Sequence, residues 1–159
     1  MSSHRITLQS HSPQNTADIA QALGQKLRAG DCLLFEGPVG AGKSLFCRAL
    51  IQSLQDTPED VPSPTFTLIQ TYDTGSGEVW HCDLYRINDP FEIAELGLLD
   101  AFETSICLVE WPDRLGNLAP QTALHVALAD AGSQTRDITI SGDKRAWAER
   151  LAGISHAAQ

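Results

Sequence analysis

Residues 31–44 read DCLLFEGPVGAGKS, an apolar run that leads directly into a glycine-rich loop. The run from Asp31 to Glu36 is short and apolar, which favours a buried parallel strand. After the loop, apolar residues recur at helical spacing to about Gln55. A strand, a glycine loop and a helix in this order predict an α/β fold that presents a helix N-terminus to an anion.

The loop matches the pattern G-x-x-x-x-G-K-[ST], known as the P-loop, at every specified position. Glycines let the backbone fold tightly enough for several N–H groups to point at one phosphate chain. We expect Lys43 to reach the β- and γ-phosphates and the Ser44 hydroxyl to bind Mg²⁺. The predicted nucleotide-binding residues of this segment are Gly37, Val39, Gly40, Ala41, Gly42, Lys43, Ser44 and Leu45.

Hydrolysis of a nucleotide also requires a carboxylate for the metal and a group that orients water. Asp83 and Glu110 each end an apolar strand-like run, where a side chain emerges at the edge of a parallel sheet beside the phosphates. One of them is expected to hold Mg²⁺ and the other to orient the attacking water, and the sequence leaves open which does which. Glu36, just before the loop, is a weaker candidate, because its carboxylate can simply be solvated there.

A proline-containing segment, Ser63-Pro64-Thr65-Phe66, begins about 20 residues after Lys43. Many P-loop proteins carry a mobile threonine that senses the γ-phosphate in this region, which makes Thr65 a candidate. The alternative interpretation is a proline turn that enters a strand.

The remaining pattern predicts one α/β domain over residues 1–159, with a mixed central sheet flanked by helices. Thr16 is predicted to be the N-cap of a helix that stops at Gly30. Further helices are expected at 89–96 and 144–151, and further strands at 5–9, 66–72, 78–83, 106–109, 123–129 and 136–141.

Composition excludes some function classes. The chain has 11 basic and 20 acidic residues, a formal charge of −9, and no basic run, so an autonomous nucleic-acid-binding surface is not expected. No apolar run approaches the roughly 20 residues that a membrane helix needs, and the first residues do not resemble a signal peptide. We therefore expect a cytoplasmic protein that makes no membrane contact.

Four cysteines are present, and none forms a C-x-x-C pair. Buried, reduced thiols are the favoured interpretation, with metal or disulfide use as the alternative.

Four segments together resemble the TsaE (formerly YjeE) family, the ATPase component of bacterial tRNA threonylcarbamoyladenosine synthesis. They are the loop, S-P-T-F-T-L at residues 63–68, H-x-D-x-Y-R at 81–86 and E-W-P at 110–112. The loop is shared with a very large superfamily, whereas the other segments are more specific. The resemblance extends from Ile6 to about Ile140.

This resemblance implies that ATP or ADP and Mg²⁺ bind at the loop, and that hydrolysis is slow outside a complex with the proteins TsaD and TsaB. Those partners modify adenosine 37 of tRNA, so contact with tRNA would be indirect. It also implies that Thr65 lies in a switch-like segment, that Asp83 is needed for hydrolysis and that Glu110 serves the metal. Trp111 would lie near the nucleotide or the partner, and Arg136 is a candidate to cover the base.

Two positions depart from the family pattern. Ser44 replaces a frequent Thr without loss of the hydroxyl, whereas Pro38 replaces a usual Asp or Asn and fixes φ within the loop.

Two other functions remain as alternatives, a small-molecule kinase and a nucleotide-binding module without turnover. A kinase would require a lid rich in arginine, yet only Arg48 and Arg86 lie between the loop and Glu110. A module without turnover would not require both Asp83 and Glu110.

Overall fold

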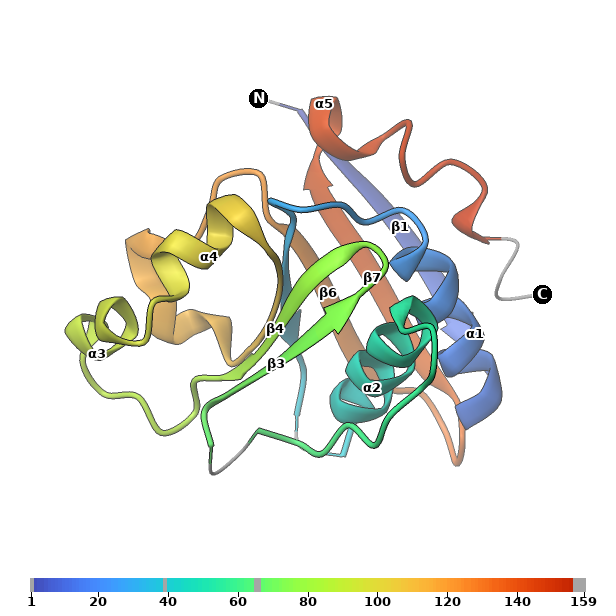
Figure 1. Ribbon diagram of the computed structural model, residues 1–159. Helices are drawn as coiled ribbons and strands as arrows, with labels where there is room; N and C mark the ends of the chain where they lie inside the picture. The colour runs from blue at the N-terminus through green and yellow to red at the C-terminus, as the bar shows by residue number, and fades with distance from the viewer. Residues whose placement is uncertain (1, 39, 65–66, 156–159) are drawn as a thin grey trace.

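The computed structural model describes residues 2–38, 40–64 and 67–155, and these form a seven-stranded mixed sheet with helices on both faces (Figure 1). The strand order is β1-β7-β6-β2-β5-β4-β3. The strands are β1 (Ser3–Ser10), β2 (Cys32–Glu36), β3 (Ile69–Thr74), β4 (Gly77–Asp83), β5 (Ile106–Glu110), β6 (Leu124–Asp130) and β7 (Arg136–Asp143). The predicted α/β class with a mixed central sheet is confirmed.

The centre of the sheet is parallel and its margins are antiparallel. Strand β2 pairs in parallel with both β5 and β6, and β5 pairs in parallel with β4. The pairs β1–β7, β6–β7 and β3–β4 are antiparallel. The apolar run of β2 is buried because strands flank it on both sides and helices cover both faces. Its carboxyl end, where the glycine loop starts, therefore lies at the middle of one sheet edge.

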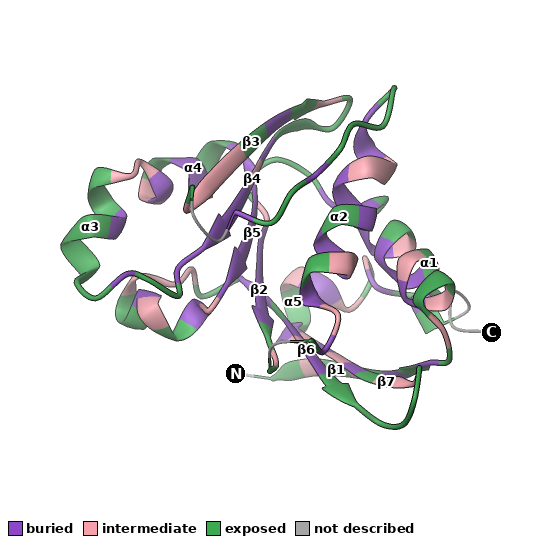
Figure 2. Cartoon of the chain, turned by 90° about the horizontal axis from the view of Figure 1, so that it is seen from below, coloured by how far each residue is buried: buried purple, intermediate pink, exposed green. Residues whose placement is uncertain are grey.

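Two apolar cores lie on opposite faces of the sheet (Figure 2). On one face, α1 (Pro13–Gly24) and α2 (Lys43–Leu54) pack side by side. On the other face lie α3 (Pro90–Glu95), α4 (Leu98–Thr104) and the 3₁₀ segment η1 (Pro112–Leu118). The last helix, α5 (Lys144–Trp147), joins the first core through the buried Trp147. None of the described helices is both long and apolar enough to cross a membrane.

The first helix differs from its prediction at both ends. Ser12, and not Thr16, is the N-cap, because the Ser12 hydroxyl accepts a hydrogen bond from the Asn15 amide at 3.0 Å. Thr16 is buried inside the helix, where its hydroxyl lies 2.5 Å from that of Ser10. The helix ends at Gly24 rather than Gly30.

Three further differences concern short elements. Strand β3 begins at Ile69, later than predicted, and residue 66 lies outside the described residues. The last helix ends at Trp147 rather than at residue 151. The elements α4 and η1 were not predicted; each has only seven residues, so a periodic pattern extends over only about two turns.

Candidate functional site

The glycine loop connects the end of β2 to the start of α2. Gly37, Gly40 and Gly42 have φ angles of 141°, 87° and 103°, which side-chain-bearing residues rarely adopt. Gly42 is the N-cap of α2 and has no side chain, so the first amides of the helix face the loop without a side-chain cap. The local geometry is that of an anion-binding helix N-terminus. Val39, which the sequence assigns to the same loop, lies outside the described residues.

A cavity of about 490 Å³ opens beside this loop. It brings together the loop, the first turn of α2 and the ends of β4 and β5, which are far apart in the sequence. Its lining residues are Gly40, Gly42, Lys43, Ser44, Leu45, Ser63, Asp83, Tyr85, Glu110 and Trp111. The predicted phosphate-binding lysine and both predicted acids therefore face one space.

The two acids are direct neighbours across the sheet. Strands β4 and β5 are parallel, and their register pairs Asp83 with Glu110. Both residues are buried, with 6% and 4% of their surface exposed. Asp83 also accepts a hydrogen bond from the Tyr85 amide at 2.9 Å, which fixes its orientation at the strand end. The two carboxylates line the same cavity as the basic Lys43.

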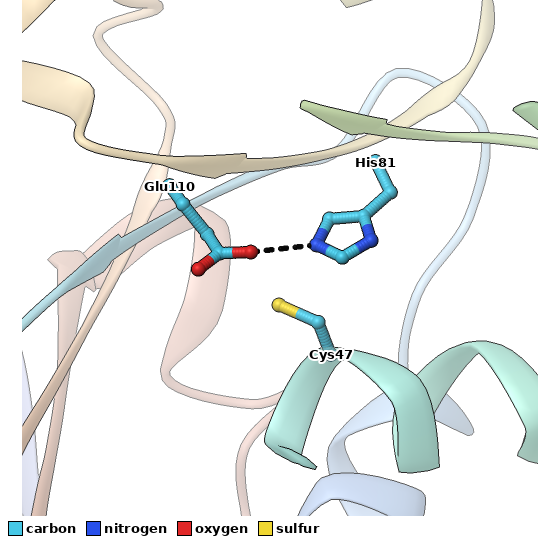
Figure 3. Close-up of side chains that lie close together, drawn as sticks. All are labelled: Cys47, His81 and Glu110. Atoms are coloured by element: carbon cyan, nitrogen blue, oxygen red, sulfur yellow. Dashed lines mark hydrogen bonds and ion pairs between the residues drawn. The ribbon is translucent and has the colours of Figure 1, made fainter. Parts of the chain in front are cut away.

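Glu110 is further held by His81 (Figure 3). The His81 Nε2 and Glu110 Oε2 atoms lie 2.8 Å apart, and both side chains are almost fully buried. With an ionised Glu110, Nε2 carries the proton and donates it. The other ring nitrogen, Nδ1, has no hydrogen-bond partner among the described residues. His81 lies two residues before Asp83 on β4, and only the pairing of β4 with β5 reveals its contact with Glu110.

The third side chain at this point is Cys47 of α2, which sequence reasoning did not single out as a site residue (Figure 3). All four cysteines are buried and free, as predicted. Burial raises the pKa of the Cys47 thiol well above its usual value, and the Glu110 carboxylate raises it further. The thiol is therefore protonated and weakly reactive at neutral pH.

Trp111 lies over the lysine of the loop. The Lys43 ammonium is 4.3 Å from the centre of the Trp111 ring, a distance typical of a cation–π contact. Tyr85 packs against the same ring at 4.8 Å between centroids. Trp111 adopts a left-handed conformation with φ 59°, which turns the chain out of β5 and directs the indole into the cavity.

The remaining predicted site residues are not among the described residues that line the main cavity. Glu36 is exposed, and its nearest ionic partner is His125 at 4.0 Å, so its carboxylate is solvated. Arg136 forms an ion pair with Asp130 at 3.0 Å. It lines a second, smaller cavity of about 80 Å³ together with Pro13, Thr16, Gly42, Leu45, Ser133 and Gln134. Thr65 lies outside the described residues.

The donor set of the main cavity fits a magnesium nucleotide. Ser44 offers a hydroxyl and Asp83 and Glu110 offer carboxylates, and Mg²⁺ prefers such oxygen ligands. The loop amides and Lys43 suit the phosphates. Residues that could hold the metal and those that could hold the phosphates thus line the same cavity.

Comparison with known proteins gives a consistent result. The family model described as threonylcarbamoyl adenosine biosynthesis protein TsaE matches residues 10–138. A relative from Rickettsia bellii, the tRNA threonylcarbamoyladenosine biosynthesis protein TsaE, is 37% identical over 118 residues, which cover 74% of this chain and 82% of the relative. The protein of that name from Bacillus subtilis is 37% identical over 130 residues, which cover 81% of this chain and 80% of the relative.

A solved structure agrees with these sequence matches. The crystal structure of Bacillus subtilis YdiB superposes with a TM-score of 0.83 at 26% identity and covers 100% of this chain and 99% of that one. The sequence matches and this superposition lead to one conclusion: the chain belongs to the TsaE family.

Proposed function

We propose that this chain binds ATP with Mg²⁺ and hydrolyses it as the ATPase component of the machinery that makes threonylcarbamoyladenosine in tRNA. The observation that carries the proposal is the single cavity that holds Lys43, Ser44, Asp83 and Glu110. The names of its relatives support the biosynthetic role. The motif resemblance supports TsaD and TsaB as partners and ADP as the product.

The roles of the residues follow from their positions. The loop amides and Lys43 hold the phosphates, and Ser44 and Glu110 hold the metal. Mg²⁺ held there would supply positive charge against the negative charge that develops during phosphoryl transfer. Asp83, one strand away from Glu110, orients the attacking water or assists at the metal. His81 keeps the Glu110 carboxylate in place through its buried hydrogen bond.

Contact with tRNA is assigned to the partners. A net charge of −9 makes phosphate binding by the surface of this chain unfavourable. We accordingly propose that the protein acts in the cytoplasm as a nucleotide-dependent subunit, and that binding and hydrolysis of ATP change how it docks on TsaD and TsaB.

Phosphate release, measured with and without TsaD and TsaB, tests this proposal. Lys43→Ala is expected to abolish turnover. Asp83→Asn is expected to retain ATP binding and to lower the rate about 100-fold or more, as removal of a group that assists proton transfer does. The matched control is Glu36→Gln, because Glu36 also ends a strand beside the loop but is exposed.

The outcomes separate the alternatives. An equal loss of rate in Asp83→Asn and Glu36→Gln would contradict the assigned role of Asp83. Binding of ATP without phosphate release under any condition would indicate a binding module. Appearance of a phosphorylated metabolite in place of free phosphate would indicate a kinase.

A further inference from the structure

Three side chains with metal-binding atoms meet between α2 and the strands β4 and β5. Cys47 comes from α2, His81 from β4 and Glu110 from β5, and all three are buried. One ligand atom of each lies within 4.8 Å of those of the other two. Figure 3 shows the Cys47 sulfur directed toward the space between the imidazole ring and the carboxylate.

We propose that these three residues form a site for a soft divalent cation of the Zn²⁺ class, and that occupation of this site inhibits the nucleotide site. Thiolate, imidazole and carboxylate together are typical zinc ligands, whereas thiolate and imidazole are poor ligands for Mg²⁺. The site is therefore chemically distinct from that of the nucleotide's magnesium, although it shares Glu110.

The geometry requires small movements. Bonds of Zn²⁺ to S, N and O place tetrahedral ligand atoms about 3.3–3.8 Å apart. The 2.8 Å contact between His81 and Glu110 must open slightly, and the Cys47 sulfur must approach from a separation of at most 4.8 Å. The first change is at most about 1 Å and the second at most about 1.5 Å, which side-chain rotations can supply.

The charges balance in the buried space. The thiol proton leaves to solvent, and bonds form from the cation to Sγ of Cys47, Nε2 of His81 and a carboxylate oxygen of Glu110. The imidazole proton moves from Nε2 to Nδ1. One thiolate and one carboxylate then neutralise the divalent cation, so the buried cluster carries no net charge and avoids the cost of an unpaired buried ion.

Glu110 connects this site to the nucleotide cavity, which it also lines. A cation bound to its carboxylate draws an oxygen away from the position in which it would serve Mg²⁺. The inhibitory part of the proposal therefore rests on the proposed function, whereas binding of the cation itself does not.

Cobalt titration tests the binding site on the full chain without nucleotide, with a reductant that contains no thiol. One equivalent of Co²⁺ is expected to give the near-ultraviolet absorption of a cobalt–thiolate bond. Cys47→Ser is expected to lose this absorption, and its affinity for Co²⁺ is expected to be at least about tenfold lower. Even residues that only hydrogen-bond to a metal ligand contribute a factor of about ten to metal affinity. The matched control is Cys107→Ser, whose thiol belongs to the core on the opposite face of the sheet.

Two results would overturn the site. One is the absence of cobalt uptake by the unmodified chain, and the other is an unchanged spectrum and affinity in Cys47→Ser. Thermal unfolding shows whether each variant is folded, and His81→Gln, which removes the imidazole ligand, provides a second variant with the same expected loss of affinity.

The inhibition has its own measurement. Buffered free Zn²⁺ is expected to stop phosphate release by the unmodified chain, and Cys47→Ser is expected to require at least about tenfold more. Equal sensitivity of both proteins would contradict the inhibitory role. A chain that binds Co²⁺ through Cys47 but releases no phosphate even when Co²⁺ and Zn²⁺ are absent and Mg²⁺ is present would refute the proposed function and leave the cation site intact.

Discussion

Replacement of Gly37 by Ala is expected to destabilise the junction between β2 and the phosphate loop. A Cβ atom at this position would lie 2.3 Å from the Leu128 carbonyl oxygen, a backbone atom of the neighbouring strand β6. That contact is too short to persist, and neither strand can move freely because both lie within the sheet. In addition, φ of Gly37 is 141°, where an alanine is strained.

The magnitude follows from these two costs. Positive φ costs a non-glycine residue about 1 kcal/mol. The close contact of the new Cβ with the Leu128 carbonyl oxygen lowers the free energy of unfolding by about 2 kcal/mol more. For a chain of this size each kcal/mol lowers the unfolding temperature by about 2–4 °C, so a decrease of about 6–12 °C is expected.

Gly40→Ala is the matched control within the same loop. Its φ is 87°, yet a Cβ there would meet no atom of the described residues within 4 Å, so only the conformational cost applies and a decrease of about 2–4 °C is expected. Calorimetry of the nucleotide-free proteins measures both values. Equal unfolding temperatures of the two variants would refute the argument, because they would show that the contact with Leu128 is relieved without cost.

Three further predictions concern other parts of the molecule. Trp111→Ala removes the ring that contacts the Lys43 ammonium. It is expected to weaken the stimulation of phosphate release that we propose for TsaD and TsaB, with a smaller effect on fold stability; normal stimulation would contradict this role. Arg150 donates hydrogen bonds to both carboxylate oxygens of Asp31. Arg150→Ala should therefore lower the free energy of unfolding, measured in urea, by about 2 kcal/mol, and Arg150→Lys should lower it by less. Burial raises the pKa of Cys107 to about 12, and it also raises the pKa values of the other three cysteines. At neutral pH, iodoacetamide should therefore label these thiols only when urea unfolds the chain. Rapid labelling of the folded chain, detected by mass spectrometry, would refute this.

Much of the candidate site could be predicted because its signals are local. The loop pattern needs only eight consecutive residues, Gly37 to Ser44, and its glycines have the positive φ values that such a turn requires. Asp83 and Glu110 could be singled out because each ends an apolar run. The assignment of parallel strands then placed both at the same sheet edge.

Local signals failed where two interpretations compete over a few residues. Thr16 is a plausible N-cap by residue type, yet Ser12 followed by Pro13 is the stronger start, because proline is favoured at the first helical position. Leu98, Ala101 and Phe102 of α4 have helical spacing, but this spacing extends over only seven residues, and η1 is interrupted at Gly116.

The sequence by itself therefore determined the glycine loop, the fold class and the two strand-end acids, since each depends on the order and periodicity of residues within single elements of the chain. Only the tertiary structure decided that Glu110 is held by His81, that Cys47 lies beside both, and that Trp111 covers Lys43. The physical reason is that these contacts join residues from different elements. Their distances are set by the register of β4 against β5 and by the packing of α2 on the sheet, which no local pattern encodes.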